Sequence, residues 1–138
     1  MINLAVLTRR QEIIQKIKRG KIEIEGAALI GRHCQIDDGV RIANSCIDNF
    51  TRIGKGVNIE NSAVLDRVII SEGAEVKDSI IGRHATILSS NRKQTRINAV
   101  SVVADDVTIE EGCALTAARI YPHQRVRGDI QNQTLMAS

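Results

Sequence analysis

An aliphatic residue recurs about every six positions along most of this chain, and this spacing limits the folds that the sequence can adopt. Six is an even multiple of the two-residue repeat of a β-strand, but it is only about 1.7 turns of an α-helix. On extended chain these side chains share one face, whereas on a helix they would scatter around the axis. The spacing therefore predicts strands. The series reads Ile24, Ile30, Ile36, Ile42, Ile47, Ile53, Ile59, Leu65, Ile70, Val76, Ile81 and Ile87.

A second inward position accompanies each aliphatic residue. The residue four places later is usually compact, as at Ala28, Cys34, Val40, Cys46, Thr51, Val57, Ala63, Ala74 and Ala85. Three such segments make one triangular coil, and Ile36, Ile53 and Ile70 show its length, because they are 17 residues apart. Leucine-rich and helical repeats are longer, at roughly 20–47 residues. The pattern predicts an all-β parallel β-helix whose coils stack about 4.8 Å apart.

The series is interrupted once. No inward aliphatic stands at the expected place within 88–96, and the pattern then resumes at Ile97, Val103, Ile109, Leu115, Ile120 and Val126. We therefore expect a parallel β-helix over residues 24–128, of about six triangular coils, with a loop at 88–96 that leaves one corner. Residues 129–138 are polar and are expected to form a flexible tail.

Residues 1–23 are expected to cap the first coil, since an open solenoid end exposes apolar side chains and unpaired strand edges. Thr8 followed by Gln11 resembles a capping box, and Gly20 is a suitable stop. We predict a helix from about Arg9 to Arg19 that plugs the coil; a lid or a partner-binding helix is the alternative. Its apolar stripe consists of Ile13, Ile14 and Ile17.

The composition limits the classes of function. The 138 residues suit one domain, and the formal net charge is only +3 with one Phe, one Tyr and no Trp. Nucleic-acid binding requires dense phosphate neutralisation or stacking platforms, so it is not expected. No apolar run is long enough to cross a bilayer, and the start MINLAVLTRR lacks the apolar core of a signal peptide. A cytoplasmic protein without membrane contact is expected.

The three cysteines do not form a disulfide framework or a zinc motif. Cys34, Cys46 and Cys113 contain no CxxC spacing and are odd in number. All three fall at compact positions of the repeat, so buried reduced thiols are expected.

Several segments resemble a known family. The hexads IGRHCQ and IGRHAT resemble the hexapeptide-transferase superfamily, and NSCIDNFTRIGKGVNIENSAVL, KDSIIGRHATI and ARIYPHQRV are similar to the C-terminal β-helix of sugar-nucleotide pyrophosphorylases of the mannose-1-phosphate guanylyltransferase type. This resemblance alone implies a left-handed helix, since ordinary parallel crossovers are right-handed in about 98% of cases. It also implies a role in assembly and regulation or, as in bifunctional members, acetyl transfer from acetyl-CoA. Nucleotidyl transfer by this chain alone is not expected, because the Gly-x-Gly-Thr-Arg loop of the catalytic domain does not occur in this sequence.

Histidines are the candidates for catalysis. In an acetyl-CoA-dependent acyltransferase, a histidine at a subunit interface would act as general base on the acceptor. His84 and His33 occupy the same hexad position 51 residues apart, which places them on one edge three coils apart. His123 is the third histidine. Such repetition looks more like a preference of the repeat than a site, and of the candidates we favour His84 because it lies closest in sequence to the loop at 88–96.

The loop supplies the candidate substrate-binding residues. Arg92, Lys93 and Arg96 could hold a phosphate of CoA or of a nucleotide, or they could serve solvation alone. A zinc site like that of the γ-class carbonic anhydrases needs three histidines within about 4 Å of one another. His33 and His84 of one chain cannot meet that condition, and histidines of neighbouring subunits could meet it only at matching height, so no metal is expected.

The leading hypothesis is an accessory, oligomerising β-helix protein without a cofactor. We expect a homo-oligomer, a trimer, which can partner a separate nucleotidyltransferase catalytic chain. The alternatives are a hexapeptide acyltransferase with its site between subunits and a purely structural oligomerisation module.

Overall fold

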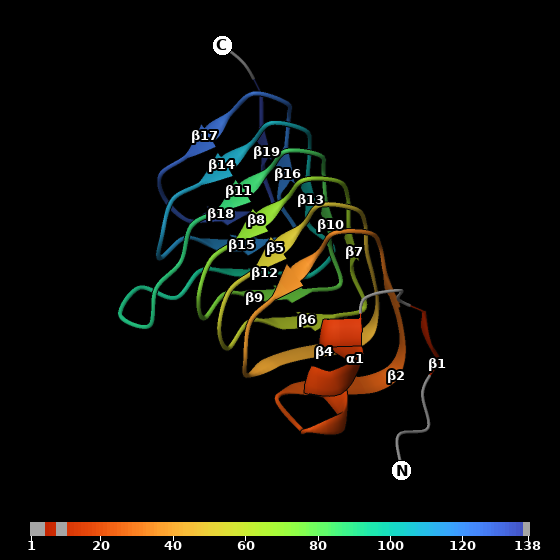
Figure 1. Ribbon diagram of the computed structural model, residues 1–138. Coiled ribbons are helices and arrows are strands. Elements are labelled where there is room, and N and C mark those ends of the chain that lie inside the picture. Colours follow the sequence, from red (N-terminus) through yellow and green to blue (C-terminus); the bar gives the residue numbers. More distant parts are fainter. Residues whose placement is uncertain (1–4, 8–10, 137–138) are drawn as a thin grey trace.

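The computed structural model describes residues 5–7 and 11–136, which form a three-sided parallel β-solenoid of about seven turns. Figure 1 shows the strands stacked in three columns that run along the solenoid. All pairings between neighbouring strands are parallel. The predicted parallel β-helix is confirmed, and the six expected coils are followed by part of a seventh. Its left-handed winding remains a prediction from the family resemblance.

Each column of strands forms one face of the solenoid. Face 1 consists of the first halves of β2 (Ile22–Ile30) and β4 (Val40–Ile47), then β6 (Asn58–Glu60), β9 (Glu75–Lys77), β12 (Arg96–Asn98), β15 (Ala114–Thr116) and β18 (Ile130–Gln131). Face 2 consists of β1 (Ala5–Leu7), the second halves of β2 and β4, then β7 (Ala63–Val64), β10 (Ile80–Ile81), β13 (Val102–Val103), β16 (Arg119–Ile120) and β19 (Thr134–Leu135). Face 3 consists of β3 (Gln35–Ile36), β5 (Arg52–Ile53), β8 (Ile69–Ile70), β11 (Thr86–Ile87), β14 (Thr108–Ile109) and β17 (Arg125–Val126).

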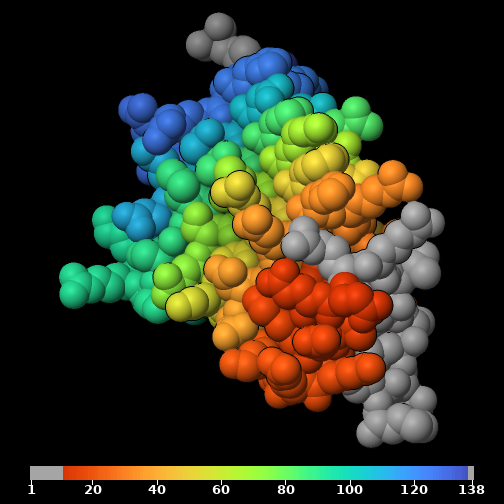
Figure 2. All heavy atoms as spheres, viewed as in Figure 1, coloured from red at the N-terminus to blue at the C-terminus, as the bar shows by residue number. Residues whose placement is uncertain are grey.

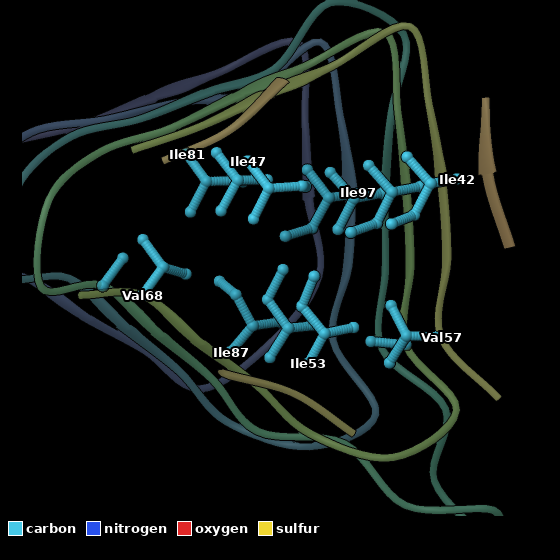
Figure 3. Packing of buried hydrophobic residues seen from close by; sticks show 14 of the residues in the cluster. Ile42, Ile47, Ile53, Val57, Val68, Ile81, Ile87 and Ile97 are labelled. Carbon is cyan, nitrogen blue, oxygen red and sulfur yellow. The ribbon is translucent and has the colours of Figure 1, made fainter. Parts of the chain in front are cut away.

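The interior is filled by ladders of identical or similar aliphatic side chains. Ile42 and Ile59 pair in register on face 1, and Ile53 and Ile70 do so on face 3. Figure 3 shows these ladders converging from three sides, with the stack that contains Ile81 opposite the stack that contains Ile87. Because each coil places a similar side chain on the one below, the narrow core needs no aromatic residue.

Two details of the inward pattern differ from the expectation. Val64, not Leu65, points inward on face 2 and is buried, while Leu65 is partly exposed. Cys46 and Ala63 lie one residue outside the inward position, which Ser45 and Ser62 occupy. These departures share a cause: the corner between face 1 and face 2 uses one residue fewer than the other corners.

That corner, called corner A here, contains a buried serine ladder. Ser45 Oγ accepts the N–H of Ser62 at 3.0 Å, and Ser62 Oγ accepts the N–H of Ser79 at 3.1 Å. Ser79 Oγ and Ser101 Oγ accept in turn from Ser101 N–H at 3.3 Å and Ala118 N–H at 3.0 Å. Each hydroxyl also donates to a carbonyl of its own coil, for example Ser62 to Glu60 O at 2.7 Å. The ladder satisfies backbone groups where the chain turns too sharply for strand pairing.

Corner B joins face 2 to face 3, and corner C joins face 3 to face 1. Corner B is formed by residues with positive φ that stack on one another, namely His33, Phe50, Arg67, His84, Asp106 and His123. Corner C uses glycines for the same backbone conformation, among them Gly39, Gly56 and Gly73.

The helix α1 (Gln11–Lys18) lies against the first coil. Ile13 and Ile17 are buried in the common core, and Lys16 Nζ donates to Ile36 O at 2.9 Å. Gly20 ends the helix with φ of 74°. The predicted N-terminal helix is thus present, its role as a plug remains a prediction, and Thr8 and Arg9 lie outside the described residues.

The loop spans residues 88–95, because Arg96 already belongs to β12, and Figure 2 shows it projecting from the body of the solenoid. Thr95 anchors its end, since its buried hydroxyl donates to Leu88 O at 2.6 Å. The segment from Asp129, expected to fray, instead contributes β18 and β19 to the sheet up to Leu135.

Candidate functional site

The outer row of face 2 is apolar over five coils. The residues that precede the inward aliphatics pair in register in the order Leu29, Cys46, Ala63, Ile80 and Val102. Leu29 and Ile80 are each 47% exposed and Val102 is 38% exposed. Arg119 and Thr134 continue the same row at the C-terminal end. A contiguous exposed apolar patch on a soluble protein marks an interaction surface more often than chance exposure does.

The outer surface of face 1 is charged. Arg41 forms ion pairs with Glu25 in the coil below and with Glu60 in the coil above. Lys77 Nζ lies 3.8 Å from the second carboxylate oxygen of Glu60. Hydrogen bonding to Arg41 lowers the pKa of Glu60 below its ordinary value, and hydrogen bonding to Glu25 and then Glu60 raises the pKa of Arg41. The charges on face 1 therefore bind one another along the solenoid.

The outer row of face 3 is mostly polar. Its members are Gln35, Arg52, Ile69, Thr86, Thr108 and Arg125. Arg125 pairs with Glu110 at 3.1 Å. Ile69 is the one bulky apolar residue in this described row. Only face 2 thus combines a flat sheet with an uninterrupted apolar row among the described faces.

A shallow hollow lies where face 2 meets corner B. Its volume is about 450 Å³, and Leu29, Cys46, Ala63 and Leu65 form its apolar part. Arg32 contributes to its polar edge. The hollow exists because compact residues follow Leu29 in the outer row, so the surface is lower over Cys46 and Ala63 than over the bulky residues beside them.

Corner B carries the aromatic and basic side chains nearest this hollow. The rings of His33 and Phe50 stack with centroids 5.1 Å apart, and the Arg67 guanidinium lies 4.7 Å from the centroid of the Phe50 ring. This three-layer stack fills the edge of three successive coils. Stacking of this kind stabilises the corner.

One polar atom in corner B lacks a hydrogen-bond partner. Asn49 Oδ1 accepts the N–H of Arg32 at 2.7 Å, and the corresponding Asp105 Oδ1 accepts from Arg83 at 2.8 Å. Asp66 has the same place in its coil, but its buried Oδ1 has no partner within the described chain. The N–H that it would accept belongs to Asn49, which donates to Asp48 Oδ1 at 2.8 Å instead.

The histidines do not converge on a common site. His33 and His84 lie on corner B as expected, separated by the coils of Phe50 and Arg67. His84 precedes β11, whereas the loop at 88–95 follows β11 at corner C, so closeness in sequence does not bring them together. His123 Nδ1 lies 3.5 Å from Asp106 Oδ2 on the same corner.

The basic residues of the loop are also divided. Arg92 and Lys93 are exposed near its tip. Arg96 points outward from face 1, donates to Gln94 Oε1 at 2.8 Å and lies 3.5 Å from Glu75 Oε2. The loop itself is tied to the coil below, because Asn91 donates to Glu72 and Gln94 donates to Gly73 O, both at 2.6 Å.

The cysteines correct one expectation. Cys34 and Cys113 are buried, and burial raises the pKa of the Cys113 thiol. Cys46 is a free thiol but is exposed in the outer row of face 2. The prediction of burial was wrong for Cys46 because the shortened corner A moves it from the inner to the outer side of the strand.

No cluster of three His, Cys, Asp or Glu side chains in the described part of the chain is arranged to hold a metal ion. Within residues 5–7 and 11–136, no helix has the length and apolar character needed to span a bilayer.

Comparison with known families identifies the solenoid. The family model described as GMPPB C-terminal domain matches residues 24–136. The chain belongs to this family. Its fold is therefore a β-helix domain like that of mannose-1-phosphate guanylyltransferase. No curated protein matches the chain.

The apolar row of face 2 is the feature of this GMPPB C-terminal domain chain that the sequence reasoning missed. The signal was present in the residue before each inward aliphatic. Every third hexad belongs to the same face. In the hexads of face 2 from Leu29 to Val102 that residue is apolar, whereas on face 1 it is Arg41, Asn58 or Glu75. Sorting the repeat by coil as well as by hexad would have separated the three faces.

Proposed function

We propose that this chain is a non-catalytic accessory module of the nucleotidyltransferase type, which assembles with other β-helices through face 2. The observation that carries the proposal is the exposed apolar row from Leu29 to Val102. Burying apolar surface stabilises an interface by about 25 cal/mol per Å². The β-helix of a separate nucleotidyltransferase catalytic chain is one occupant, and a homo-oligomer is the other.

The proposal is tested by mixing the chain with a catalytic chain of the mannose-1-phosphate guanylyltransferase type that carries its own β-helix. Light scattering after size exclusion should detect a complex, and the rate of nucleotidyl transfer should change when the complex forms. Substitution Ile80→Arg should abolish the complex. Ile69→Arg, on face 3 with a similar exposure of 43% against 47%, should leave it intact. A complex that tolerates both substitutions would contradict the role of face 2.

An acetyl-CoA-dependent acyltransferase is the second candidate. The hollow on face 2 supports it, since about 450 Å³ falls within the roughly 300–1,000 Å³ of ligand pockets and Arg32 stands at its edge. Acetyl-CoA should then raise the thermal midpoint by binding the native state, and His84→Ala should lower acyl transfer. Absence of both effects would leave assembly as the role of the chain.

A further inference from the structure

The outer row of face 2 is complementary in shape to the same row running in the opposite direction. We propose that face 2 binds face 2 of a second copy of this chain, with the two solenoids antiparallel. The two-fold axis of this pair runs along the strand direction at the level of Ala63. This inference rests on the proposed function and names the partner of the surface on which that function depends.

Shape is the first argument. The row reads bulky, small, small, bulky and medium-sized, from Leu29 to Val102. A two-fold axis at Ala63 places Ile80 of the second copy over Cys46, where the hollow of about 450 Å³ lies. The same operation places Val102 of the second copy over Leu29. Ile80 of each copy thus enters the hollow of the other, whereas Leu29 and Val102 meet as two apolar side chains at the ends of the row.

The parallel arrangement lacks this fit. A two-fold axis along the solenoid would set each residue of the row opposite itself. Leu29 would then meet Leu29 of the second copy, and Ile80 would meet Ile80, while Cys46 and Ala63 would each face their own counterpart across a gap. Arg119, next in the row, would also face its own positive charge in the second copy.

Charge at corner B gives an independent argument. With the axis at the third coil, the first coil of one copy lies opposite the fifth coil of the other. Arg32 of the first coil then faces Asp105 and Asp106 of the second copy's fifth coil. Asp66 and Arg67 lie in the third coil at the level of the axis, so each is opposite its own counterpart, and Arg67 is one position away from Asp66 of the second copy. Opposite charges therefore meet at the two ends of the interface rim, which favours this register.

The size of the surface predicts a dimer that dissociates on dilution. Five strands about 4.8 Å apart, each presenting about five residues, cover about 400 Å² of flat face. The rim at the two corners adds to this area, which brings it close to the low end of specific interfaces at about 600 Å² per partner. Interfaces of this size are common in reversible assemblies.

A trimer requires a different contact. A cyclic trimer is heterologous, so face 2 of each copy would pack against another surface of the next. The outer surface of face 1 carries the ion pairs of Arg41 with Glu25 and Glu60, and the outer row of face 3 is mostly polar. Neither offers apolar side chains that match face 2.

Sedimentation equilibrium of the whole chain at several concentrations tests the proposal. The mass should approach twice the 15.1 kDa of one chain as concentration rises. Ile80→Arg should reduce the mass to that of a monomer at every concentration. Its matched control, Ile69→Arg, should leave the mass of the wild type unchanged, and circular dichroism should show that both variants are folded.

Other masses would overturn the proposal. A wild-type chain that is monomeric throughout, or that forms a trimer, contradicts a face 2 dimer. So does a dimer that survives Ile80→Arg. If Ile80→Arg fails to fold, Cys46→Arg on the same row replaces it, with Thr86→Arg on face 3 as its control.

Cross-linking tests the antiparallel register. In a Cys46→Ser background, Ala63→Cys places a thiol at the axis, so a short bismaleimide should join two copies. Thr86→Cys in the same background, which points outward from face 3, should not cross-link at the same concentration. Parallel solenoids would give efficient cross-linking at Arg119→Cys as well as at Ala63→Cys, so efficient cross-linking at Arg119→Cys would overturn the antiparallel geometry.

The two proposals can fail separately. A chain that is monomeric alone but joins a catalytic chain through Ile80 would overturn the self-association and preserve the accessory role. A chain that dimerises through face 2 but never joins or affects a catalytic chain would do the reverse.

Discussion

Face 1 and face 2 share one interior and differ almost entirely on their outer sides. On face 1, Arg41 bridges Glu25 and Glu60, so the charges of neighbouring coils satisfy one another. On face 2, the row from Leu29 to Val102 offers apolar side chains with no such partners among the described residues of the same row. The inner positions of a β-solenoid determine the fold, and the outer positions are free to differ from face to face. Function is therefore to be sought in the outer rows.

Because the two faces share one interior, truncating a buried side chain behind either face should lower the free energy of unfolding by a similar amount. Ile59→Ala behind face 1 and Ile81→Ala behind face 2 each remove a side chain that is fully buried. Each should lower the free energy of unfolding by about 2–5 kcal/mol through lost burial and the remaining cavity. Urea denaturation at a fixed protein concentration measures both. Ile69→Ala, on the outside of face 3, should cost clearly less; a cheap substitution at Ile59 or Ile81 would show that the interior is not continuous.

Substitutions in corner A, between the two faces, should have the next largest effect on stability. Ser62→Ala removes the acceptor of the Ser79 N–H, which lies 3.1 Å from the hydroxyl in a buried position. A buried donor left without a partner costs about 1–3 kcal/mol. Urea denaturation of Ser62→Ala, compared with the partly exposed Ser71→Ala, measures this cost. Equal stability of the two variants would mean that the ladder does not contribute.

Thiol reactivity should separate the outside of face 2 from the core. Cys46 is exposed, whereas Cys34 and Cys113 are buried and burial raises the pKa of Cys113. Since the thiolate is the reactive form, Cys46 should be alkylated at least about tenfold faster by iodoacetamide. Mass spectrometry of the Ile80→Arg variant measures the rates on a monomer. In guanidinium chloride the three rates should become similar; a fast Cys113 in the native protein would contradict its burial.

The smallest expected effect is the pH dependence of the ion pairs on face 1. The pKa of Glu60 is lowered from 4.5, so its contribution to stability is present above about pH 4.5 and is lost as the pH falls through the lowered value. Glu60→Gln should therefore lose less stability than the wild type between pH 6 and pH 3. The difference should stay within about 1 kcal/mol, because the pair is partly solvated. The thermal midpoints of the wild type, Glu60→Gln and the control Glu111→Gln, measured across this range, test the prediction. If the wild type and Glu60→Gln decline identically, the ion pair contributes nothing to stability.

The fold could be predicted from the sequence because the same pattern of inward and outward residues recurs in every coil of a solenoid. Isoleucines at 36, 53, 70 and 87 all point inward, and each is at most 3% exposed. The error at Leu65 and the misplacement of Cys46 arose at corner A, where five-residue steps leave two neighbouring residues that both suit the interior. Burial of Ser62 was not predictable from hydrophobicity, because only its place in a hydrogen-bonded ladder makes a buried hydroxyl favourable.

The candidate site was harder to predict than the fold. The sequence placed His33 and His84 correctly on one edge. It favoured His84 for its closeness in sequence to the loop, but that loop lies at corner C and His84 lies at corner B. Proximity along the chain misleads in a solenoid, since six residues lead from one corner to the next. The apolar face was hidden for the opposite reason: Leu29 and Ile80 are far apart in sequence, and only the stacking of coils makes them neighbours in one row.

The loop at 88–95 shows how the solenoid absorbs a change in chain length. Val76 and Ile97 are register partners although they are 21 residues apart, whereas Ile59 and Val76 are partners at 17, so the excess is taken up within one corner. The coils on both sides keep their pairing. An epitope or a reporter peptide inserted between Arg92 and Lys93 would thus be displayed at a fixed height on a rigid rod, and corner C becomes an attachment point for cargo that leaves face 2 free.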